Sequence, residues 1–277
     1  DWSYYSNKLV QEKYALDDEM LKPYFKLENV QKGVFDLATR LYGITFKEVN
    51  NIPLYHPEVK TYEVYDNDGS FLAVLYTDFF PRESKGGGAW MTQFRGQKMV
   101  NGKDQRPLVS LVMNFTKPTD TKPSLLTFNE VTTFLHEFGH ALHGMFSKCT
   151  YGSTSMDGVS RDFVELPSQF MENFALEKEW LDTWAVHYQT GEKIPQEYID
   201  KIKKSSNFQA GYASDRQLSF GMVDMAWHTI TEPVTEPLVD FEQRAMGKTE
   251  IMPLVKGSAF SPAFGHIFAG GYAAGYA

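Results

Sequence analysis

The sequence predicts a mainly α-helical protein with a small antiparallel or mixed β-sheet. Apolar residues recur at three- and four-residue steps over long stretches, which is the spacing of one helix face. Two short β-rich runs, 61–65 and 71–76, flank the turn signal Asp-Asn-Asp-Gly at 66–69 and predict a hairpin. A third β-rich run covers 108–115. Helical patterns outnumber these three strands, so helices should form most of the fold.

The remaining patterns are helical. We expect helices over residues 9–16, 30–42, 128–146, 177–188, 196–208, 212–231 and 238–246. The second of these should end near Gly43, because glycine is common just past the end of a helix. Another helical segment should open at Arg161, with apolar residues at helical spacing: Phe163, Leu166, Phe170 and Phe174.

The most informative stretch is His136-Glu137-Phe138-Gly139-His140, which reads H-E-x-x-H. Residues four apart share one face of a helix, so both imidazoles can bind one metal ion. Glu137 projects beside them, close enough to accept a proton from a water on that ion. The motif is typical of zinc-dependent peptide hydrolysis. The alternative is a buried helix that carries two histidines and a glutamate without a metal.

The helix that carries this motif has a clear beginning. Thr127 and Glu130 have the T-x-x-E spacing of a capping box, and Leu126 and Val131 are placed for a hydrophobic staple. Apolar residues then recur at helical spacing: Val131, Phe134, Leu135, Phe138, Leu142, Met145 and Phe146. Gly139, between the two histidines, leaves room for another element to approach closely.

Two histidines leave a catalytic zinc ion short of a third protein ligand. His143 lies a further turn along the same helix from His140, so it is better placed to pack or to support a ligand. Glu165 is the stronger candidate, because a loop rich in Gly, Ser and Thr lets the chain reverse before it. Its neighbours are apolar, and a carboxylate among them needs a partner such as a metal ion. A salt bridge to Arg161 is the alternative.

A second group of functional candidates lies near the end of the sequence. It comprises His266, Tyr272 and Tyr276, with paired glycines at 270–271 that give a flexible backbone. Hydrogen-bond donors of this kind stabilise the negative charge that develops on an attacked carbonyl oxygen. The alternative is a structural segment of glycine and small residues.

These motifs carry a family resemblance. H-E-F-G-H-A-L-H followed by R-D-F-V-E-L-P-S-Q resembles the thimet oligopeptidase and dipeptidyl carboxypeptidase family of zinc peptidases. Further blocks resemble its bacterial peptidyl-dipeptidase branch: W-S-Y-Y at 2–5, L-K-P-Y-F at 21–25, L-Y-H-P at 54–57, D-F-F-P-R at 78–82 and G-G-A-W-M at 87–91. The resemblance covers nearly the whole chain and implies one zincin-like, neurolysin-like multihelical catalytic region over 1–277.

The resemblance also implies roles for the candidate residues. In that family two histidines and the glutamate of F-V-E bind zinc, the motif glutamate is the base, and tyrosines of a glycine-rich loop reach the substrate carbonyl. Here the implied zinc ligands are His136, His140 and Glu165, the base is Glu137, and the loop residues are Tyr272 and Tyr276 with His266 beside them. One departure is the run 155–157, Ser-Met-Asp, where the family usually has Ser-Gly-Thr, so the conformation of this loop is left open.

The implied activity is hydrolysis of short peptides with release of C-terminal dipeptides. One alternative is an oligopeptidase that cleaves internally, and another is a truncated domain that binds zinc or peptides without turnover. Zinc peptidases commonly bind substrate along a sheet edge, which the hairpin or the strand at 108–115 could offer. Family sequences have a large helical portion before this point, so we expect the chain to lack that N-terminal wall of the cleft. Alone, it should bind zinc but hydrolyse peptides poorly, and it should expose apolar surface where the wall would pack.

Composition restricts the partners. The net charge is −8 and no basic stripe is present, which argues against nucleic acid. No apolar run is long enough to cross a membrane. Cys149 is the only cysteine, so an intramolecular disulfide cannot form. No signal peptide is visible, which favours the cytoplasm, and the periplasm stays open because the native N-terminus is not visible.

Overall fold

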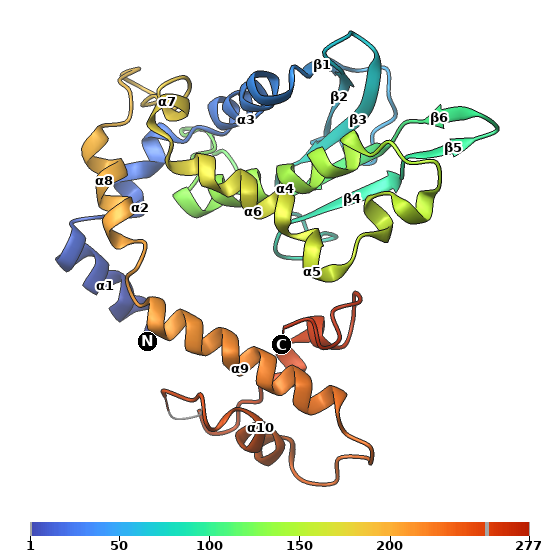
Figure 1. Ribbon diagram of the computed structural model, residues 1–277. Helices are drawn as coiled ribbons and strands as arrows, with labels where there is room; N and C mark the ends of the chain where they lie inside the picture. Colours follow the sequence, from blue (N-terminus) through green and yellow to red (C-terminus); the bar gives the residue numbers. More distant parts are fainter. Residues whose placement is uncertain (1, 253–254, 277) are drawn as a thin grey trace. The chain divides into compact units, whose positions relative to one another are not determined.

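The computed structural model describes residues 2–252 and 255–276 of the chain. It divides into two compact units, Asp1–Ser205 and Ser206–Ala277. The larger unit combines a sheet with helices, and the smaller unit contains two longer helices and an irregular segment after them (Figure 1).

The larger unit confirms the mainly α prediction with a small mixed sheet. Its α-helices are α1 (Trp2–Tyr14), α2 (Asp18–Leu21), α3 (Leu27–Tyr42), α4 (Phe128–Phe146), α5 (Arg161–Val164), α6 (Leu166–Glu172), α7 (Lys178–Leu181) and α8 (Gln196–Ser205). Its strands are β1 (Thr45–Val49), β2 (Lys60–Tyr65), β3 (Phe71–Asp78), β4 (Trp90–Arg95), β5 (Lys98–Val100), β6 (Lys103–Gln105) and β7 (Leu108–Val112). The smaller unit has α9 (Ala210–His228) and α10 (Leu238–Met246). Among the residues described, no helix is long and apolar enough to cross a bilayer.

The five-stranded sheet has the order β1-β2-β3-β7-β4. β7 runs parallel to β3, and the other neighbours are antiparallel. The predicted hairpin joins β2 to β3, and Gly69 in its turn has a φ of 80°, a left-handed conformation that favours glycine. The sequence patterns did not reveal β1 or β4, because polar and half-exposed residues interrupt both strands.

This strand order corrects one expectation. β2, β3 and β7 each have a neighbour on both sides, so neither the hairpin nor the strand at 108–115 offers a free edge for a peptide. The edges of the five-stranded sheet are β1 and β4. Of these, β4 lies beside α4, as Figure 1 shows.

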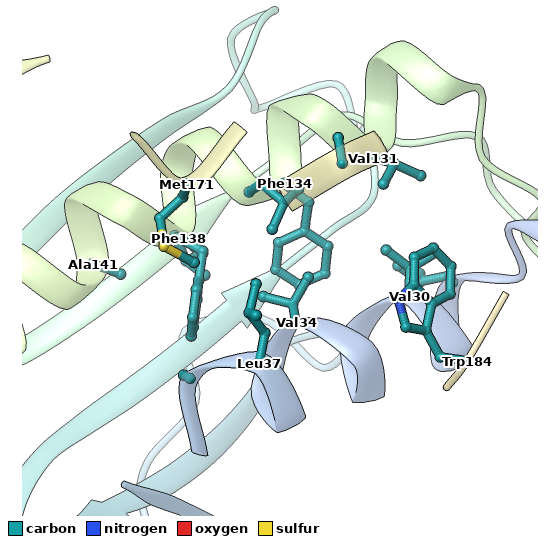
Figure 2. Close-up of a cluster of buried hydrophobic side chains, with 14 of the residues drawn as sticks. Val30, Val34, Leu37, Val131, Phe134, Phe138, Ala141, Met171 and Trp184 are labelled. Carbon is teal, nitrogen blue, oxygen red and sulfur yellow. The ribbon is translucent and has the colours of Figure 1, made fainter. Parts of the chain in front are cut away.

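Helices α3 and α4 pack together over one face of the sheet. Figure 2 shows Val30, Val34 and Leu37 of α3 beside Phe134 and Phe138 of α4. Each of these side chains is at most 4% exposed. Full burial of one such side chain contributes about 1.5–3 kcal/mol. The core therefore fixes the position of α4 on its apolar side.

The structure confirms how α4 begins. The Thr127 side chain accepts a hydrogen bond from the backbone N–H of Glu130, and the Glu130 carboxylate accepts one from the N–H of Thr127. Leu126 and Val131, the proposed staple pair, are both fully buried in the same core. The helix spans Phe128–Phe146, as its apolar pattern predicted.

Two helix predictions were wrong in extent. The helix expected over 177–188 is only the short α7, because the chain then turns so that Val186 pairs with Lys193 in a β-bridge. The helix expected from Arg161 is broken at Glu165, and Pro167, which has no backbone N–H, stands at the start of α6. The predicted apolar face is half exposed, at 50% for Phe163, 55% for Leu166 and 50% for Phe170.

A buried ion cluster holds the glycine-rich segment that leads into β4. Asp78, at the end of β3, accepts hydrogen bonds from Arg82, Lys85 and Tyr55. Burial alone raises the pKa of the Asp78 carboxyl, but these donors outweigh burial and leave the pKa below its ordinary value. The amide of Asn114 also donates to two carbonyl groups in the range 86–88. The Asp78 cluster and Asn114 thus both hold the segment that precedes β4.

Candidate active site

Helix α4 and the junction between α5 and α6 bring the three predicted metal ligands together. Nε2 of His136 and Nε2 of His140 lie 3.2 and 3.1 Å from the same atom, Oε2 of Glu165. One donor atom from each residue lies within 4.8 Å of the other two. His136 and His140 share a face because they are four residues apart on α4. Glu165 reaches them from the next segment of the chain.

The close approach of α4 and α6 depends on Gly139. A Cβ atom at this position would lie 2.4 Å from the carbonyl oxygen of Pro167 and 2.6 Å from Cα of Ser168. Both are backbone atoms and cannot rotate away. The expectation that this glycine admits a neighbouring element is confirmed. Ser168 also donates a hydrogen bond of 2.9 Å to Oε2 of Glu165, which orients the carboxylate toward the histidines.

Glu172 supports the cluster, and the sequence analysis missed it. Its Oε1 lies 2.6 Å from Nδ1 of His136. When Nδ1 carries the proton and donates a hydrogen bond to this carboxylate, Nε2 has no proton. Its lone pair then points at Glu165. A signal was present in the sequence, because Glu172 follows Glu165 by seven residues, which is close to two helical turns.

The chemistry of this cluster fits a bound cation. Two imidazole nitrogens and a carboxylate oxygen converge on one point. Their lone pairs repel one another unless a positive charge lies between them. Two histidines and one carboxylate form a common donor set for catalytic zinc. On the other side of His140, Nδ1 is buried, and the described residues provide no hydrogen-bond partner for it.

Glu137 lies beside the cluster without joining it. Burial raises the pKa of its carboxyl to about 7, the charge of His136 lowers it, and that of Glu165 raises it. A carboxylate with such a pKa accepts and returns protons near neutral pH. Glu137 borders a cavity of about 330 Å³ lined by Ala89, Asn129, Thr132, Thr133, His136, Glu137 and Glu172.

The sheet edge borders the same cavity. Ala89 immediately precedes β4, and the backbone of Met91 within β4 acts on Glu137 and lowers its pKa. Further along this strand, the Gln93 amide donates a hydrogen bond of 2.8 Å to Asp157. Asp157 belongs to the loop that departs from the resembled family pattern. The hydrogen bond to Asp157 therefore links this loop to the edge strand.

His143 has the supporting position that its spacing predicted. The group of potential metal ligands found among the described residues consists of His136, His140 and Glu165, and His143 is outside it. Its Nδ1 is buried without a hydrogen-bond partner in the described part of the chain, and burial lowers its pKa. A neutral packing histidine accounts for both properties.

The smaller unit gathers the other predicted residues. Nδ1 of His266 lies 3.1 Å from the hydroxyl of Tyr276. The ring of His266 stacks on Tyr272, with 5.3 Å between centroids and 11° between planes. The three residues thus form one cluster. They lie in residues 265–276, which we call the tyrosine segment. Its role in catalysis stays a prediction.

Comparison with known proteins gives consistent matches over the whole chain. A sequence profile of Peptidase family M3 matches residues 1–276. The chain is 44% identical to a dipeptidyl carboxypeptidase of Salmonella typhimurium and 42% identical to an oligopeptidase A of the same organism. It is 40% identical to a probable cytosolic oligopeptidase A of Arabidopsis thaliana. Each match covers 100% of this chain, which spans 41%, 41% and 40% of the length of these relatives.

Proposed function

The chain belongs to peptidase family M3, and on that premise we propose that it is the zinc-binding catalytic region of a metallopeptidase that releases dipeptides from short peptides. The convergence of His136, His140 and Glu165 on one point, with Glu137 beside them, carries this proposal. We assign Zn²⁺ to the cluster because this donor set suits it.

The proposed ligands and the proposed base have different chemical roles. When bound, Zn²⁺ would polarise a peptide carbonyl and lower the pKa of a water molecule to roughly 7. Glu137 would take the proton from the attacking water and later return it to the leaving amine. Glu172 would keep Nδ1 of His136 protonated, and Ser168 would hold the carboxylate of Glu165. These two residues would support the ligands.

The edge strand β4 is the proposed docking site for the peptide backbone. An extended peptide that adds to a free sheet edge gains main-chain hydrogen bonds. β4 pairs with β7 on one side only, and Ala89 at its start lines the cavity beside His136. A peptide along β4 would therefore run past the metal ligands. Tyr272 and Tyr276 are proposed as donors to the carbonyl oxygen as it becomes negatively charged.

Internal cleavage by an oligopeptidase is the second candidate. Relatives named oligopeptidase A are 42% and 41% identical to the chain, close to the 44% of the dipeptidyl carboxypeptidase. One family thus contains relatives named dipeptidyl carboxypeptidase and relatives named oligopeptidase. Product lengths from one longer peptide with a blocked N-terminus distinguish the two modes. Successive dipeptides from the C-terminus support the first, and a single internal cut supports the second.

The central test compares two isosteric changes of a carboxylate. Glu137→Gln should keep stoichiometric zinc and lose hydrolysis of a short peptide, because the amide cannot accept the proton. Glu179→Gln is the matched control, since this side chain is 84% exposed and pairs with Arg40. A chelator should abolish wild-type hydrolysis, and added Zn²⁺ should restore it. Hydrolysis that persists in Glu137→Gln, or with the metal removed, contradicts the proposal.

A further inference from the structure

A buried carboxylate in the smaller unit holds the tyrosine segment. Asp224, on α9, has 0% exposure. Its two oxygens accept hydrogen bonds of 3.0 Å from the backbone N–H groups of Ala274 and Tyr276. Nδ1 of His228, one turn further along α9, lies 2.8 Å from Oδ1 of the same carboxylate. A single side chain thus joins the helix to the end of the segment.

The tyrosine segment needs such a holder because regular structure does not fix it. After the 3₁₀ turn Gly265–Ile267 it continues as turns, with left-handed φ values of 80° at Gly270, 78° at Gly271 and 55° at Ala274. Glycine adopts this conformation freely, whereas alanine is strained in it. The strained residue, Ala274, is one of the two whose N–H groups Asp224 binds. The carboxylate therefore offsets the strain at the place where it arises.

Hydrogen bonds to a charged carboxylate are strong enough for this purpose. Such bonds contribute more than bonds between neutral groups. Nδ1 of His228 lies 2.8 Å from this carboxylate and 2.8 Å from the backbone carbonyl oxygen of Asp224. Glu242 of α10 binds backbone in the same way earlier in the irregular region. Its carboxylate accepts hydrogen bonds from the backbone N–H groups of Phe260 and Ser261. Asp224 acts within the tyrosine segment itself.

We propose that Asp224 is a positioning residue that fixes the backbone between Tyr272 and Tyr276 and thereby sets where their hydroxyl groups point. The inference rests on the proposed function only for its effect on catalysis. The effect on the backbone follows from the geometry of Asp224 alone. His228 is assigned the secondary role of holding the carboxylate in this orientation.

The test is Asp224→Asn in the full chain, with two independent measurements. The amide keeps the shape of the side chain, but its NH₂ group faces a backbone N–H and cannot accept from it. Amide-resolved hydrogen exchange should speed up at Ala274 and Tyr276 by about tenfold or more. Turnover of a short peptide should fall by about tenfold while the Michaelis constant and zinc content stay unchanged. Asp215→Asn, which removes the same charge from the same helix, should change none of these.

The outcomes separate the inference from the proposed function. Unchanged exchange at Ala274 and Tyr276 overturns the positioning role. Faster exchange with unchanged turnover supports that role but contradicts the catalytic role of the tyrosines. If Asp224→Asn does not fold, His228→Gln decides, because it leaves the carboxylate in place and removes only its partner. It should accelerate the same two amides by a smaller factor, and no acceleration there overturns the inference.

Discussion

The metal-ligand cluster and the tyrosine segment are held in opposite ways. The ligands sit on α4 and beside α6, whose positions are set by a large apolar core and by close backbone packing at Gly139. The tyrosine segment has little regular structure, and one buried carboxylate, Asp224, binds its backbone. The backbone that carries the candidate ligands should tolerate the loss of any one hydrogen bond. The second should respond strongly to the loss of one.

The largest effect is expected at the proposed zinc ligands. Glu165→Ala should abolish stoichiometric zinc binding, because it removes one of three protein ligands. Glu172→Gln, which weakens only the support of His136, should reduce zinc affinity by about 10- to 100-fold. Metal analysis and competition with a chelator measure both. Full zinc retention in Glu165→Ala would show that the third ligand is another residue.

A smaller effect is expected from the tyrosines. Tyr272→Phe and Tyr276→Phe each remove one hydroxyl donor and should lower turnover by about a hundredfold, with little change in the Michaelis constant. Zinc content should not change, which separates this effect from that of the ligands. Steady-state kinetics on a short peptide gives the result. If both variants turn over like the wild type, the segment has a structural role only.

Helix packing at the metal site should show the next effect. Gly139→Ala places a methyl group against the backbone of Pro167 and should cost about 1–3 kcal/mol of unfolding free energy, together with weaker zinc binding. Gly211→Ala is the matched control, because a Cβ there meets no atom within 4 Å. It should be neutral or stabilise slightly, since alanine restricts the unfolded chain. Denaturant unfolding measures both. Equal behaviour of the two variants would refute the close-approach argument.

The smallest effect is expected at the start of α4. Thr127→Ala removes one half of the capping box and should cost about 1 kcal/mol of unfolding free energy. Zinc affinity should stay near that of the wild type, because the apolar core still fixes the helix. A zinc affinity that falls together with stability would mean that the ligand helix is no better supported than the tyrosine segment.

The sequence predicted α4 well because its signals are local. The capping box at Thr127 and the apolar periodicity depend on residues a few positions apart, and the H-E-x-x-H spacing depends on one helical turn. The same holds for the hairpin at 66–69, where turn chemistry defines the connection. Glu165 was identified from its apolar neighbours and the family resemblance, and the structure places it beside both histidines.

Other features depend on contacts between distant residues, which no local pattern reveals. β4 is an edge strand because of the order in which the sheet assembles, and its sequence carries weak alternation. The helix expected over 177–188 stops early because Val186 pairs with Lys193. Phe163 and Phe170 have helical spacing, yet the break at Glu165 leaves them half exposed. Tertiary pairing outweighs local preference in the first two cases, and Pro167 stands at the break in the third.

The sequence by itself determined the helix that carries H-E-x-x-H, the three candidate metal ligands and the mainly α class, because each depends on spacing within one element or on a distinctive motif. Only the tertiary structure revealed the two supporting carboxylates, Glu172 and Asp224. Glu172 supports His136 across 36 residues of chain, and Asp224 binds the N–H of Ala274 across 50. The sequence alone does not show whether an Asp or Glu side chain is exposed or buried. Its role is set by the donors that folding brings to its two oxygens.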